Sequence, residues 1–248
     1  MKPEPYPLTN AYFKTARALV HLDELKAALN SFADSQPYTV TSLEEPEGDA
    51  IRYRVEIQHP HVTLFLIAAD VLQCLRTALD QAVWSLASLK HSDPDWTEFP
   101  IYDEPLDSNS GKRFERKLHG IPDKALAYIT SLQPFNRPPG TPPADCLLWQ
   151  LHELNRIEKH RRILVRSMFT GISRNMPGFS SNFIPLRWEP QDYGCDVICA
   201  GAYKALPTLT PIVVFGEQRS GITIEVSGIE QIYEFVSGHV LPTLAGFA

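Results

Sequence analysis

The sequence predicts an α+β fold in which a helical bundle core is interlocked with an antiparallel β-sheet. The stretch from Leu66 to Leu89 has the apolar spacing of a long amphipathic helix, and Leu147 to Val165 matches it. Segments with the alternating pattern of strands lie both before and after this helical middle. The two kinds of structure must therefore fold together as one unit.

Length and composition are those of one folded domain. The chain has 248 residues, of which 44% are hydrophobic and 21% charged, which suffices to bury a full core. We therefore interpret residues 1–248 as a single α+β domain. Its helical core is expected at about 9–33, 62–90, 111–166 and 228–247, and its β part at about 38–58 and 183–227.

The protein is expected in the cytoplasm, away from the membrane, and without cofactors. Charged residues are spread through the N-terminal segment, and nowhere do roughly 18 uncharged apolar residues follow one another. The cysteines are too few and too scattered for a disulfide framework. Cys195 and Cys199 share one face of an expected strand, but no second ligand pair follows at zinc spacing, so we expect no metal site.

Before the central helix, Thr9 or Asn10 can cap a first helix that runs to about Ala33. A hairpin follows, with strands at Tyr38 to Leu43 and Ile51 to Gln58.

Between the two long helices, prolines and aspartates in SDPDWTEFPIYDEP prevent regular structure, and we expect a loop ordered by covered side chains of Trp96, Phe99 and Ile101. Short helices are expected at Gly111 to His119 and at Pro122 to Leu132.

Asp145 should cap the second long helix. Beyond it the pattern changes to β. The expected strands are Phe183 to Trp188, Val197 to Lys204, Pro211 to Phe215 and Ile222 to Val226. A closing helix is expected from Gly228 to Leu244.

The central helix should have one core face and one polar face. At about 100° per residue, one side is apolar. That side carries Val71, Leu75, Ala78, Leu79, Ala82 and Leu86. The opposite side carries Asp70, Gln73, Thr77, Asp80, Gln81 and Trp84. Arg76 lies at the boundary between the two.

On the second long helix, Glu158 projects into a stripe of leucines, where an unpaired carboxylate is costly. Arg76 is its best partner, either in a structural bridge between the helices or with the guanidinium also contacting a substrate phosphate. Asp80 could hold the guanidinium from the other side or make a surface pair one turn away. We expect Asp80, Glu158 and Asn155 to form a structural network.

The end of the second helix is strongly basic although the net charge of the chain is −6. The cations from Arg156 to Arg166 are Arg156, Lys159, Arg161, Arg162 and Arg166. His160 lies among them, and neighbouring cations favour its neutral form, which suits a general base. The alternative is an ordinary histidine on a solvated face. No glycine-rich phosphate loop, GxSxG or HExxH motif is present, which disfavours nucleotide hydrolysis and serine hydrolase chemistry.

The order and spacing of several short motifs resemble a widespread bacterial family of unknown function. They are AADVLQCLRTALDQAVWSL, FPIY, ITSLQPF and LWQLHELNRIEKHRRIL. The first motif of that family is in turn similar to the motif of HEPN-superfamily ribonucleases, which are helical, usually dimeric and metal-independent. In this chain the two motif positions are Arg76 and Gln81, so the motif histidine is replaced by an amide that cannot transfer a proton.

The resemblance implies an HEPN-like protein that binds RNA or a nucleotide, with a homodimer as the expected assembly. Lys159, Arg161, Arg162 and Gln81 would contact RNA. If the protein is a ribonuclease, His160 replaces the missing histidine and Arg76 stabilises the phosphorane charge. The rival hypothesis is a non-catalytic ligand-binding or protein-interaction domain, in which Arg76 belongs to a buried network.

Overall fold

The computed structural model of the chain describes residues 8–44, 50–91, 94–160, 164–170, 194–200, 210–217 and 222–248. These residues form a mixed α+β fold that is mostly helical, with antiparallel sheets. The helical elements are α1 (Thr9–Asp34), α2 (Val62–Ser88), α3 (Ser108–Lys117), α4 (Asp123–Ser131), η1 (Pro134–Asn136), η2 (Pro143–Asp145), α5 (Leu147–His160), α6 (Val226–Glu234), η3 (Phe235–Val240) and α7 (Leu241–Ala245). The strands are β1 (Tyr38–Glu44), β2 (Ala50–Ile57), β3 (Leu164–Thr170), β4 (Gly194–Ala200), β5 (Thr210–Glu217) and β6 (Ile222–Glu225).

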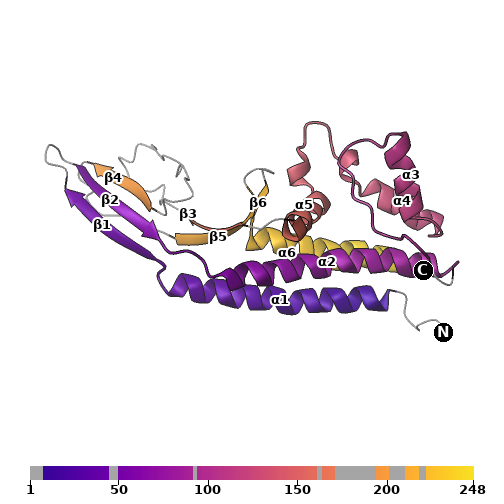
Figure 1. The fold of residues 1–248 in the computed structure, drawn as a ribbon, viewed down its shortest axis with the longest axis horizontal. Coiled ribbons are helices and arrows are strands. Elements are labelled where there is room, and N and C mark those ends of the chain that lie inside the picture. Colours follow the sequence, from indigo (N-terminus) through magenta and orange to yellow (C-terminus); the bar gives the residue numbers. More distant parts are fainter. Residues whose placement is uncertain are drawn as a thin grey trace.

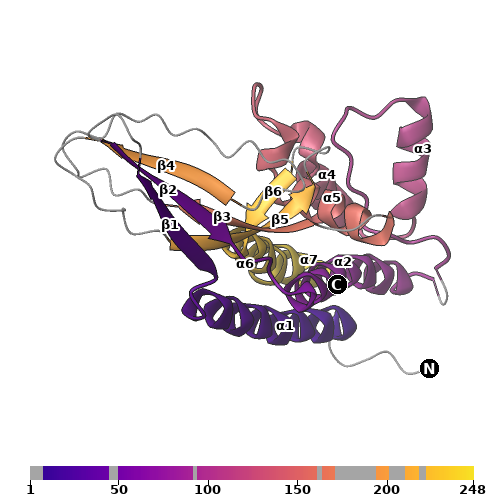
Figure 2. The same ribbon diagram turned by 60° about the vertical axis from the view of Figure 1, so that its left-hand side comes forward.

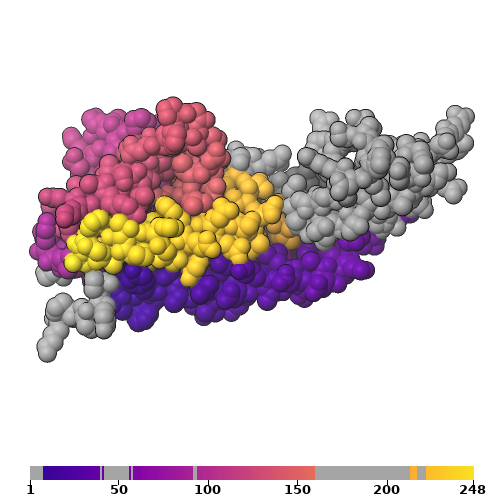
Figure 3. All heavy atoms as spheres, turned by 180° about the vertical axis from the view of Figure 1, so that it is seen from behind, coloured from indigo at the N-terminus to yellow at the C-terminus, as the bar shows by residue number. Residues whose placement is uncertain are grey.

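Helices α1 and α2 run antiparallel along the long axis of the molecule, and the hairpin β1–β2 extends beyond one end of this pair (Figure 1). The C-terminal helical segment lies beside them and separates α1 from α5 on the face in Figure 3. The predicted core face of α2 is confirmed, because all six of its apolar residues from Val71 to Leu86 are buried. Its spacing alone therefore identified the side that packs.

Helix α5 lies against α2 and buries the apolar residues Leu148, Leu151, Leu154 and Ile157. The prediction that this helix continues to Val165 is wrong, since α5 ends at His160 and β3 begins at Leu164. Val165 pairs with Phe215 of β5, so its backbone hydrogen bonds go to a strand far away in the sequence. Helical spacing within one segment cannot reveal such a partner.

The strands form two antiparallel sheets in the described part of the chain, where the sequence suggested one. The first has the order β1-β2-β4, and the second has the order β3-β5-β6. Val55 of β2 pairs with both Val40 of β1 and Cys195 of β4, so strands from either side of the helical middle share a sheet. Figure 2 shows β5 and β6 beside α5 and α6. The expected strand Phe183 to Trp188 lies outside the described residues.

Several helix ends differ from the sequence prediction. Leu8, rather than Thr9 or Asn10, precedes α1, with φ of 65° and only 2% exposure, so burial of an apolar side chain replaces a polar cap. The side chain of Asp107 accepts hydrogen bonds from the backbone at Asn109 and Ser110 and starts α3 three residues before the expected Gly111. Asp145 ends the turn η2, and α5 starts at Leu147.

The closing helix is interrupted by one wider turn. Residues Phe235–Val240 form a π-helical turn between α6 and α7, and Pro242 stands in the first turn of α7. Because proline has no N–H to donate, the wider turn accommodates the break in the hydrogen-bond ladder while Val236 and Val240 stay buried.

Helix α2 is long and apolar enough to cross a membrane. In this structure 50% of its most apolar stretch is buried inside the protein. Core helices of soluble proteins have the same composition, so the observation is weak evidence for a membrane span.

The loop between α2 and α3 is only partly as expected. Phe99 is fully buried and Ile101 half-buried, which orders the loop, but Trp96 is 76% exposed. The prediction that Trp96 is covered is therefore wrong.

Candidate functional site at the junction of α2 and α5

Arg76 is held inside the protein by three acceptors. Its side chain is 6% exposed. One guanidinium nitrogen, Nη2, donates to Asp80 Oδ1 at 2.9 Å, to Glu98 Oε1 at 2.9 Å and to the Phe99 carbonyl at 2.7 Å. Its other terminal nitrogen, Nη1, is buried and has no partner among the described residues. Arg76 thus fastens the loop at residues 98–99 onto α2.

The predicted ion pair between Arg76 and Glu158 is wrong. The carboxylates that reach the guanidinium are Asp80 and Glu98, and no ion pair joins Glu158 to Arg76 in the part of the chain described. Glu158 is half-buried on α5. Glu98 comes from an irregular loop, and no periodic pattern could have placed it next to α2.

Asp80 completes this arrangement from one turn further along α2. Its Oδ1 accepts from Arg76 and also from the backbone N–H of Phe99 at 3.0 Å. Burial raises the pKa of Asp80 above its ordinary value, although Arg76, the Phe99 N–H and Lys159 act in the opposite direction. The expected pairing of Asp80 with Arg76 at one-turn spacing is confirmed.

Glu98 is shared between α2 and α3. Its Oε1 contacts Arg76, while its Oε2 pairs with Lys117 Nζ at 2.9 Å. Burial alone would raise the pKa of Glu98, but the hydrogen bond and charge of Lys117, together with Arg76 and His152, outweigh it and lower the pKa. We call Arg76, Asp80, Glu98 and Lys117 the Arg76 cluster.

His152 borders the Arg76 cluster, and the sequence analysis missed it. Burial lowers the pKa of His152, and the positive charge of Arg76 lowers it further. The imidazole is therefore neutral near pH 7 and is able to accept a proton. The sequence did contain one signal for His152. It lies one turn before Asn155 on the same helix, and Asn155 was already expected in the network.

Asn155 and Gln81 were both expected at the site, and Asn155 has a hydrogen-bond partner there. Asn155 is buried, and its Nδ2 donates to Gln73 Oε1 of α2 at 2.8 Å. It thus links the two helices, but through Gln73 and not through Glu158. Gln81 is half-buried, and its Oε1 has no hydrogen-bond partner among the described residues.

The basic end of α5 is described only in part. Lys159 is exposed, and its charge acts on Asp80. Arg156 pairs with Glu153 through a hydrogen bond from Nε at 2.8 Å, so this cation is partly neutralised. Arg161, Arg162 and the side chain of His160 lie outside the described part of the chain. At this end of α5, the structure therefore describes one cation, Lys159, that faces solvent next to the Arg76 cluster.

Comparison of the chain with protein-family models, with curated proteins and with solved structures finds no match in any of the three. The function must be argued from the site itself.

The low pKa of His152 gives a prediction for stability in acid. In the unfolded chain the imidazole of His152 takes up a proton near its ordinary pKa of 6.5, whereas in the folded chain it takes up the proton only at lower pH. Unfolding is therefore favoured as the pH falls through this window. The stability contribution is fully present above 6.5 and is lost towards the lowered pKa of the folded state.

Urea denaturation at about pH 7.5 and about pH 5.5 measures this effect. The free energy of unfolding should fall less in His152→Gln than in the parent, while the variant His239→Gln, changed at an exposed histidine, should match the parent. An equal acid loss in His152→Gln and the parent would contradict the assignment.

Proposed function

We propose that the protein binds RNA or a nucleotide without cleaving it. The observation that carries this proposal is the burial of Arg76, together with its hydrogen bonds to protein oxygens. A guanidinium that stabilises a phosphorane must direct its donors at the substrate, whereas Arg76 is 5% exposed and its Nη2 donates to three protein oxygens. Gln81, at the place of the motif histidine, cannot transfer a proton.

The binding part of the proposal rests on the cations at the end of α5 and directly after it in the sequence. Lys159 is exposed at the end of α5, and Arg161 and Arg162 follow it in the sequence. With a net charge of −6, the whole protein repels a polyanion, so affinity has to come from a local group of this kind. Phosphate contacts by Lys and Arg are the usual origin of salt-sensitive affinity for nucleic acids.

Fluorescence anisotropy with a labelled single-stranded RNA tests binding. The parent should bind at low salt, and the plot of log affinity against log salt should be steeper than for the variant Lys159→Ala/Arg161→Ala/Arg162→Ala. Three lost phosphate contacts change this slope by about 2 for a single strand. The control Lys14→Ala/Arg17→Ala/Lys26→Ala removes the same charge from α1 and should bind as the parent does.

The same RNA, incubated in metal-free buffer and run on a gel, tests whether binding leads to cleavage. We expect no cleavage by the parent or by Gln81→His. The rival ribonuclease hypothesis is favoured by the neutral His152 beside Arg76, and it requires about 10²- to 10⁴-fold from acid–base catalysis. Cleavage that His152→Ala abolishes would replace our proposal with the rival, and absence of any RNA or nucleotide binding would leave the protein-interaction alternative.

A further inference from the structure

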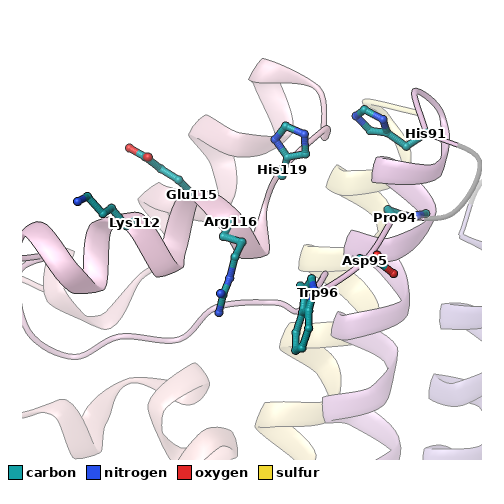
Figure 4. Close-up of a pocket in the computed structure, with 8 residues that line it drawn as sticks. All are labelled: His91, Pro94, Asp95, Trp96, Lys112, Glu115, Arg116 and His119. Carbon is teal, nitrogen blue, oxygen red and sulfur yellow. The ribbon is translucent and has the colours of Figure 1, made fainter.

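A cleft of about 590 Å³ lies on a different part of the surface, between α3 and the segment that follows α2 (Figure 4). Its walls carry Trp96 and His91 on one side and Lys112, Arg116 and His119 on the other. This volume is in the range of small-ligand sites. The lining combines aromatic rings with cations, which are the two kinds of group that bind nucleotides in single-stranded nucleic acid.

Trp96 combines two unfavourable features. Its indole is 76% exposed, so the side chain gains little from burial. Its φ is 62°, in the left-handed region that side-chain-bearing residues rarely adopt. Strain of this kind persists where the surrounding structure imposes it, and it is common at binding sites. Here Glu98, two residues further on, is held by Arg76 and Lys117, which fixes the loop that presents Trp96.

Arg116 supports the indole and leaves part of it free. Its guanidinium carbon lies 5.6 Å from the centroid of the Trp96 ring, a cation–π distance. Figure 4 shows the Arg116 side chain extending from α3 towards Trp96. Lys112 lies one helical turn before Arg116 and lines the same cleft. The exposed part of the indole thus offers a stacking surface in the same cleft as the two cations Lys112 and Arg116.

The histidines at the far end of the cleft are also closely packed. The rings of His91 and His119 are stacked, with centroids 5.3 Å apart and planes inclined by 26°. Gly120 makes this possible, because its φ is 85° and a Cβ there would lie 2.4 Å from Cδ2 of His91. The two sides of the cleft therefore meet at this end.

Two acids, Asp95 and Glu115, line the same cleft and offset the charge of Lys112 and Arg116. A site with this balance does not suit a bare anion. It suits a ligand that has both an anionic part and N–H donors, because carboxylates accept hydrogen bonds from exocyclic amino groups of bases. Adenine, guanine and cytosine carry such a group, and uracil does not.

We propose that this cleft binds one nucleotide unit, with its base stacked on Trp96, its phosphate on Lys112 and Arg116, and its amino group on Asp95 or Glu115. The inference rests on the proposed function and gives the base a place that the basic end of α5 does not provide. The nucleotide is either free or part of a single-stranded RNA, since both offer the same chemistry.

Calorimetric and tryptophan-fluorescence titrations with guanosine 5′-monophosphate, uridine 5′-monophosphate and inorganic phosphate test the cleft, and a short single-stranded RNA tests the second source. Trp96→Gly should weaken binding by about 5- to 150-fold, the range expected for one stacked base. Glycine adopts the φ of Trp96 without strain, so the melting temperature of this variant should not fall below that of the parent. Trp84→Ala, which removes a half-exposed indole from α2, should bind as the parent does.

Tight binding of the guanosine monophosphate that Trp96→Gly weakens supports the inference for a free nucleotide. RNA binding that Trp96→Gly and Arg116→Ala both weaken, with the monophosphate bound poorly, supports it for a base in a strand. If the parent binds RNA and these two variants bind it as well as Trp84→Ala does, the inference is overturned and the proposed function stands. If the parent binds neither RNA nor a monophosphate, both are overturned.

Discussion

Replacing Arg76 with alanine should lower the free energy of unfolding by about 2–3 kcal/mol. The change removes three hydrogen bonds at once and leaves the carboxylates of Asp80 and Glu98 close together without their shared cation. Breaking a fully buried pair costs about 3–5 kcal/mol. We expect less here because the side chains of Asp80 and Glu98 are 33% and 44% exposed, so water screens part of the repulsion.

Urea denaturation followed by circular dichroism measures this loss. Lys26→Ala is the control, because it breaks an ion pair between Lys26 and Glu230 at the surface and should change the midpoint much less. Arg76→Lys should lie between the two, since a lysine keeps the charge but lacks the planar, rigid guanidinium that fixes the direction of the donors. A loss in Arg76→Ala no larger than in Lys26→Ala would contradict a structural role for this residue.

Phe99→Ala should destabilise the protein more, by about 3–5 kcal/mol. The side chain is fully buried in the main core, and its removal leaves a cavity that the packed helices cannot close. The backbone of the same residue bonds to Asp80 and Arg76, so a shift of the loop would weaken the Arg76 cluster as well. The larger loss is therefore the sum of a cavity and a loosened loop.

The matched comparison is Trp96→Gly, which changes a large aromatic residue in the same loop. Because Trp96 is exposed and strained, its removal should cost no stability, in contrast to Phe99. Both variants are measured by the urea midpoint and by the slope of the transition. Equal losses in the two variants would show that the loop, and not core packing, determines the effect.

The residues near the candidate site show how far sequence reasoning reached. That Arg76, Asp80 and Asn155 lie at the meeting of two helices follows from helical spacing on α2 and α5. That Arg76 also meets Glu98, and that Asn155 meets Gln73, did not follow, because Glu98 and Gln73 belong to segments separated in sequence from the residues they meet. His152 was overlooked for the same reason, since its pKa depends on burial and on a charge from another helix.

The sequence by itself determined those structural features that depend on residues close to one another along the chain. The apolar face of α2, the hairpin β1–β2, the closing helical segment and the mixed α+β class all follow from the periods of helices and strands. Only the tertiary structure decided that the segment from Leu164 is a strand, that Trp96 is exposed and that Arg76 bonds to Glu98 and to the Phe99 carbonyl. Each of these depends on contacts between segments far apart in the chain, whose free energies outweigh local preference and leave no periodic pattern in the sequence.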